Sequence, residues 1–202
     1  MISKKEIAAI CLNGVAAAAK KYKKWSGGVS LRSAPENFTH IILAEYLANK
    51  LGKNCTWSKL ITLEEKPKDL IQASGCPIKI KMSRRIERGR IDISVWDKKE
   101  MPWLIIEVKR HSGHKSINDD VKRIRTLFKG CPSIKAGFIV VVTQANEAET
   151  LRKRFGMMAK ESKTKKEGIS FLNGMTTKKG IARQTCAMCF VVNRGGKILV
   201  DP

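Results

Sequence analysis

The sequence predicts an α/β domain with a mixed central β-sheet flanked by helices. Strand-length runs, either alternating or wholly apolar, are interleaved with stretches of helical spacing. Near the middle of the chain the order is strand, strand, helix, strand, helix, so a hairpin is followed by a helical crossover to a buried strand. The 202 residues suffice for one hydrophobic core.

Two helices are predicted in the first quarter of the chain. Residues 3–24 open with the capping box Ser3–Glu6, and residues 35–51 follow a second S-x-x-E motif and end before Gly52. We expect residues 1–28 to form an N-terminal helix and linker. Residues 29–202 then form the main domain, with its core at about 33–160 and a C-terminal hairpin at 161–202.

The remaining elements follow in order. Short strands are predicted at 60–63 and 78–82, and a hairpin at 90–96 and 102–109. A helix at 116–128, a buried strand at 137–143 and a helix at about 145–160 come next. Beyond them we expect a short strand at 169–172, a loop at 176–184 and a hairpin that turns at Gly195-Gly196.

Charge and composition narrow the function. The chain has 40 Lys+Arg and 18 Asp+Glu, a formal net charge of +22, which favours nucleic acid as the partner. No run approaches the ~18 apolar residues of a membrane helix, so no membrane partner is expected. Six scattered cysteines indicate reduced thiols and a cytoplasmic location. The Cys186/Cys189 pair fits a hydrophobic strand better than a zinc site with His111 and His114.

Two acids of the predicted hairpin carry the chemistry. Asp92 and Glu107 are equidistant from the turn, so a symmetric hairpin places them opposite each other, and Lys109 shares the face of Glu107. Opposed carboxylates suit a hard divalent cation, Mg²⁺ or Mn²⁺, completed by the backbone carbonyl of Val108 and by water. Such a cation with a nearby lysine is typical of phosphodiester hydrolysis. The competing interpretation is an ordinary surface ion pair of Glu107 with Lys109.

These residues resemble the two core motifs of the PD-(D/E)XK nuclease superfamily, Arg90-Ile91-Asp92-Ile93 and Ile106-Glu107-Val108-Lys109. Ile91 stands where proline is nominal, and the resemblance spans roughly residues 36–143. It implies a restriction-endonuclease-like three-layer fold, metal ligation by Asp92 and Glu107, and assistance of the nucleophile by Lys109. It also implies that the helix with Asp120 and Arg123 packs behind the hairpin.

The resemblance further implies an acid from the helix before the sheet. Glu36 and Glu45 both lie on the predicted helix, but nine residues at about 100° each place them on opposite faces, so at most one reaches the site. We favour Glu36 as the additional catalytic acid, although it could instead cap the helix at Ser33. Glu45 is the alternative.

Basic residues flank the proposed catalytic hairpin. Those expected to bind nucleic acid are Lys79, Lys81, Arg88, Arg90, Arg110, His111 and Lys115. Phosphate contacts of this kind predict salt-dependent binding without base selection. The sequence thus predicts a metal-dependent nuclease that acts on DNA rather than RNA, and members of this superfamily often dimerise. A basic binding module that retains the fold without catalysis is the alternative.

Overall fold

The computed structural model describes residues 2–51, 57–76, 82–110, 114–145, 148–162, 164–178 and 181–194. Its helices are α1 (Lys4–Trp25), the 3₁₀ turn η1 (Leu31–Ser33), α2 (Glu36–Leu51), α3 (Pro67–Ala73), α4 (Arg84–Arg88), α5 (His114–Gly130) and α6 (Ala148–Ser162). Its strands are β1 (Trp57–Glu65), β2 (Ile91–Asp97), β3 (Pro102–Arg110), β4 (Ala136–Ala145), β5 (Lys165–Lys178) and β6 (Ile181–Val192).

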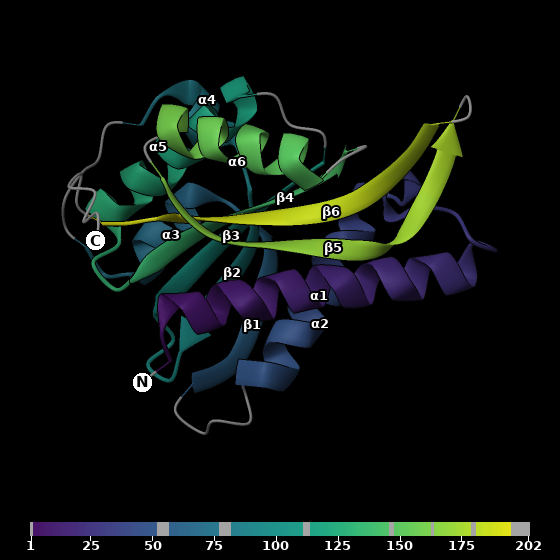
Figure 1. The fold of residues 1–202 in the computed structure, drawn as a ribbon. Coiled ribbons are helices and arrows are strands. Elements are labelled where there is room, and N and C mark those ends of the chain that lie inside the picture. Colours follow the sequence, from purple (N-terminus) through teal and green to yellow (C-terminus); the bar gives the residue numbers. More distant parts are fainter. Residues whose placement is uncertain are drawn as a thin grey trace.

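The strands form one six-stranded mixed sheet in the order β1-β2-β3-β4-β6-β5. Neighbouring strands pair antiparallel except β3 and β4, which run parallel. A parallel pair needs a long crossover, and α5 supplies it across one face of the sheet (Figure 1). The predicted α/β class and mixed sheet are therefore confirmed.

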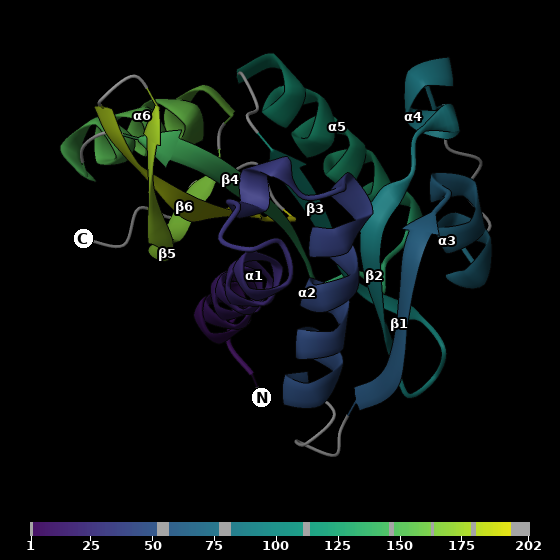
Figure 2. The same cartoon turned by 90° about the vertical axis from the view of Figure 1, so that its right-hand side faces the viewer.

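Helices cover both faces of the sheet, giving three layers (Figure 2). On one face, α1 and α2 pack against apolar side chains of the central strands, and Cys11 and Val15 of α1 are fully buried there. On the other face, α3, α5 and α6 enclose a second core that contains Cys131. The helix α1 thus contributes directly to the main core. Among the described residues, no helix is long and apolar enough to cross a membrane.

Local sequence signals explain the elements around the site. The Ser3 hydroxyl accepts a hydrogen bond from the Glu6 N–H while the Glu6 carboxylate accepts one from the Ser3 N–H, so the predicted capping box begins α1. Between β2 and β3, the Asp97 carboxylate accepts bonds from the N–H groups of Lys99 and Met101, at 2.8 and 3.0 Å. This turn closes the predicted hairpin.

The predicted loop in the C-terminal region is wrong. Of residues 176–184, predicted as a loop, 176–178 belong instead to β5 and 181–184 to β6, and these strands pair antiparallel. The segment is rich in Thr, Lys, Gln and Arg, a loop-like composition, but an antiparallel ladder is made by the backbone and tolerates it. Cys186 and Cys189 are buried in β6, as the strand interpretation predicts. The predicted turn at Gly195-Gly196 and residues 78–81 of the predicted strand 78–82 lie outside the described residues.

Candidate metal and nucleic-acid site

Three carboxylates lie level with one another on adjacent strands. Leu63 pairs with Ile93 and Glu65 with Ile91, so Glu64 of β1 faces Asp92 of β2. Ile93 pairs with Ile106, and the next position in that register places Asp92 opposite Glu107 of β3. This placement of Asp92 and Glu107 agrees with the sequence prediction, in which the two residues are equidistant from the hairpin turn. The sheet thus carries a row of acids that is costly unless cations compensate it.

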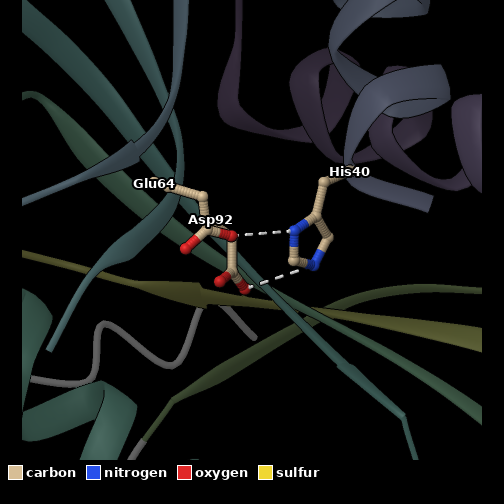
Figure 3. Close-up of side chains that lie close together, drawn as sticks. All are labelled: His40, Glu64 and Asp92. Atoms are coloured by element: carbon tan, nitrogen blue, oxygen red, sulfur yellow. Dashed lines mark ion pairs between the residues drawn. The ribbon is translucent and has the colours of Figure 1, made fainter. Parts of the chain in front are cut away.

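A histidine from α2 lies against two of these acids. His40 Nδ1 is 3.4 Å from Glu64 Oε1, and His40 Nε2 is 3.8 Å from Asp92 Oδ2. Figure 3 shows the imidazole of His40 beside the carboxylates of Glu64 and Asp92. One ligand atom from each of the three residues lies within 4.8 Å of the others. We call this group the triad.

The triad has the donor set and the environment of a cation site. His40 is only 4% exposed, yet neither ring nitrogen has a hydrogen-bond partner in the described part of the chain. Buried polar atoms without partners are costly, and a cation held between the ring and the two carboxylates could satisfy them. Imidazole with two carboxylates suits Mn²⁺ or another divalent transition metal, and carboxylates with water suit Mg²⁺. The Glu64 side chain is 44% exposed, so the triad reaches the surface.

Asp92 is fixed in this position by the neighbouring strand. Its Oδ2 atom accepts a 2.6 Å hydrogen bond from the backbone N–H of Val108. Val108 therefore contacts Asp92 through its N–H, and metal ligation by its carbonyl stays a prediction. This bond fixes the Asp92 carboxylate, which belongs both to the triad and to the row of acids on the sheet.

Glu107 lies in a buried network of charges between β3 and α5. Its side chain is fully buried, and Oε1 is 2.7 Å from Arg123 Nη1. Lys109 Nζ lies 3.7 Å from Glu107 Oε2 and 3.6 Å from Asp120 Oδ2. Asp120 Oδ1 also lies 3.5 Å from Arg123 Nη2. The four residues, here called the charge network, contain two acids and two cations.

Burial and like charges raise the pKa values of the two acids of the charge network. Burial, followed by the charges of Asp92 and Asp120, raises the pKa of Glu107 well above its usual range despite Arg123 and Lys109. Burial also raises the pKa of Asp120 to about 6, against the opposing effect of Lys109 and Arg123.

The pKa of Lys109 is also raised, but by neighbouring charges and not by burial. Burial by itself lowers the pKa of Lys109, but the carboxylates of Glu107, Asp120 and Asp92 together raise it above its usual value. Lys109 is therefore a fixed positive charge at neutral pH and not a proton acceptor. Arg123 and Lys109 each contact both Glu107 and Asp120, whereas the basic side chain that lies against Glu64 and Asp92 is His40.

Neither candidate acid of α2 joins the triad. Glu36 is exposed at the start of α2, and Glu45 is paired with Lys21 of α1 at 3.4 Å. The helix contributes His40 instead, one turn after Glu36 and on the same face. A search for carboxylates misses this residue, although a histidine inside a largely apolar helix was a usable signal. Glu64 was missed because the sequence of β1 is only weakly patterned.

The predicted nucleic-acid contacts divide into three groups. Arg88 and Arg90 are exposed and precede β2. Arg110 donates to the backbone carbonyls of Arg32, at 3.3 Å, and Ala34, so it ties β3 to the segment before α2. Lys79, Lys81 and His111 lie outside the described residues, as does the side chain of Lys115.

Comparisons with models of protein families, with curated proteins and with solved structures each gave no match. Functional inference therefore depends on the geometry of the site.

Proposed function

We propose that this protein is a metal-dependent nuclease that hydrolyses phosphodiester bonds of nucleic acid, DNA in preference to RNA. The observation that carries the proposal is the triad, in which a buried histidine with two unpartnered ring nitrogens faces Glu64 and Asp92. The net charge of +22 supports a polyanionic substrate. The preference for DNA follows from the resemblance to PD-(D/E)XK nucleases.

The residues have distinct roles in this proposal. His40, Glu64 and Asp92 hold Mg²⁺ or Mn²⁺, which when bound supplies Lewis acidity toward water and a phosphoryl oxygen. The Val108 N–H keeps the Asp92 carboxylate in place. Lys109, whose side chain is 24% exposed, presents a positive charge toward the developing negative charge of the phosphoryl group.

The fold is compatible with this activity. Helices on both faces of a mixed sheet, with the Asp92 and Glu107 strands adjacent, agree with a restriction-endonuclease-like architecture. The helix α5, which carries Asp120 and Arg123, packs behind the β2–β3 hairpin as that resemblance implies. In the proposed site Glu64 and His40 take the place of Glu107 and Glu36 as ligands.

One observation favours the alternative of a binding module without catalysis. Glu107, the acid of the E-x-K motif, is completely buried and closed off by Arg123 at 2.7 Å. Arg123 occupies Oε1, so that atom is not free to bind a metal, and the loss of either partner of such a buried pair is strongly destabilising. Under this alternative the protein binds nucleic acid and the triad remains a structural ion pair.

A cleavage assay separates the two functions. Plasmid, linear duplex, single-stranded DNA and RNA are incubated with the protein in Mg²⁺, Mn²⁺ or EDTA. We expect metal-dependent cleavage of DNA by the wild type, and a loss of about 100-fold or more for His40→Ala, Asp92→Asn and Lys109→Ala. The control variant is Glu45→Gln, an exposed acid on the same helix as His40.

Metal binding gives a second readout that does not depend on activity. Mn²⁺ should raise the melting temperature of the wild type and of Lys109→Ala, but not that of His40→Ala. A folded wild type that binds DNA, is unaffected by Mn²⁺ and never cuts it would establish the binding module.

A further inference from the structure

A second feature lies next to the triad and is not used by it. The short helices α3 and α4, with the residue before α3, line an open pocket of about 480 Å³. The residues that line it, here called the basic pocket, are Lys66, Lys68, Arg84, Glu87 and Arg88.

The chain connects the basic pocket directly to the triad. Lys66 follows Glu64 by two residues, roughly 7 Å of extended chain, and begins the segment that leads into α3. Arg88 ends α4, which leads into β2 and Asp92. Because β1 and β2 are antiparallel and Glu65 pairs with Ile91, the connections to both helices leave from the same end of this strand pair, with α4 beyond that end and α3 beside β1 (Figure 2).

Within the described part of the chain, the charge of the basic pocket is not balanced. It has four cationic residues against the single acid Glu87, and all five are exposed. None of the four cations forms an ion pair with another described residue. Elsewhere on the surface, lysines do find partners, as Lys21 does with Glu45 and Lys153 with Glu149. A concave surface with a net charge of +3 next to a proposed cation site is suited to phosphate oxygens.

We infer that the basic pocket binds a phosphate group of the nucleic-acid strand next to the bond held at the triad. The two arginines can form bidentate contacts with phosphate, and the two lysines supply compact charges. This inference deepens the proposed function and rests on it for the position of the scissile bond. The occupant is an internal phosphodiester or a terminal phosphate monoester, which share the same oxygens.

Binding in EDTA tests the inference without cleavage. Fluorescence anisotropy measures the affinity of the full-length protein for a labelled DNA oligonucleotide over a range of NaCl concentrations. The pocket variants are Lys66→Ala/Lys68→Ala and Arg84→Ala/Arg88→Ala. The matched control is Lys98→Ala/Lys99→Ala, which removes the same charge from exposed turn residues at the opposite end of β2. Circular dichroism verifies folding.

We expect each pocket variant to bind at least about tenfold more weakly than the control, with a salt slope shallower by roughly 1.4–1.8 for two lost phosphate contacts. Affinities and slopes equal to those of the control would overturn the inference. A tenfold preference of the wild type for a 5′-phosphorylated over a 5′-hydroxyl end, lost in the pocket variants, would identify a terminal monoester. Equal affinity for both ends would identify an internal phosphodiester.

The outcomes also separate this inference from the nuclease proposal. If the wild type never cuts DNA but the pocket variants bind it selectively more weakly, the nuclease proposal fails and the phosphate site stands. If the wild type cuts and the pocket variants bind as the control does, the phosphate site fails alone.

Discussion

Glu64 occupies a backbone conformation that is unfavourable for its residue type. Its φ of 58° lies in the left-handed region, although it belongs to β1. This conformation costs a non-glycine residue about 1–2 kcal/mol. Residues strained in this way are concentrated at functional sites, where the surrounding structure holds them in place. In Glu64, the strained position is the one that carries a carboxylate of the triad.

Replacing Glu64 should therefore separate stability from metal binding. We predict that the free energy of unfolding of Glu64→Gly is about 1 kcal/mol higher than that of Glu64→Ala, because glycine adopts positive φ without a steric cost. Both variants lose the carboxylate, so both should lose the rise in melting temperature caused by Mn²⁺. Urea denaturation measures the difference. Equal stability of the two variants would contradict the backbone argument.

The charge network should make stability depend on pH. The pKa of Asp120 is about 6 in the folded protein against a usual value near 3.8, so the folded state holds its proton more tightly than the unfolded state. The stabilisation is complete below pH ~4 and is lost as the pH rises through about 6. The unfolding free energy of the wild type relative to Asp120→Asn should therefore fall between these values by up to about 3 kcal/mol.

Denaturation of the two proteins at a series of pH values measures this effect. Asp119→Asn, a change of the adjacent acid on α5, is the control. A wild type that gains stability over Asp120→Asn as the pH rises would show that Lys109 and Arg123 outweigh burial at this carboxylate.

The residues of the site differ in how well the sequence indicates them. Asp92, Glu107 and Lys109 could be located because strand alternation and a counted turn determine their relative positions. His40 and Glu64 could not, since their proximity depends on how α2 packs across the sheet and on an irregular backbone at one residue. The partners of Glu107 also depend on tertiary packing, because the rotation of α5 about its own axis decides which of its polar residues face β3.

At the scale of elements, Gly137 determines how closely α5 approaches β4. A Cβ atom added at this glycine would lie 2.4 Å from Cγ2 of the buried Ile124. We predict that Gly137→Ala lowers the unfolding free energy by about 1–3 kcal/mol through overpacking. Adding Ile124→Ala should recover part of that loss, which a double-mutant cycle measures. Additive effects of the two substitutions would show that the helix does not rest on this contact.

Elements with strong patterns were predicted best. The long helices, the central hairpin and β4 agree with their predicted positions to within a few residues, because burial imposes a clear period on them. The short helices α3 and α4 were missed, and the β5–β6 hairpin was misplaced. Short helices carry little periodic signal, and a ladder held by backbone bonds needs no distinctive side chains.

For the whole molecule, the net charge of +22 should act on stability as well as on binding. Repulsion between like charges favours expansion, and salt screens it. We predict that the melting temperature rises as NaCl increases from about 50 to about 500 mM, and that the variant Lys98→Glu/Lys99→Glu shows a smaller rise. Differential scanning calorimetry measures both proteins. A melting temperature independent of salt would indicate that the cations are already well separated.

Two of the buried thiols, one in each core, give each side of the sheet its own chemical reporter. Cys11, on the buried face of α1, has its pKa raised to about 12 by burial, whereas Cys131 lies in the opposite core with its pKa raised to about 11. Neither thiol reacts with an alkylating agent until its own layer opens. In single-cysteine variants, labelling rates in mild denaturant would therefore reveal which layer detaches first. Equal rates would show that the three layers come apart together.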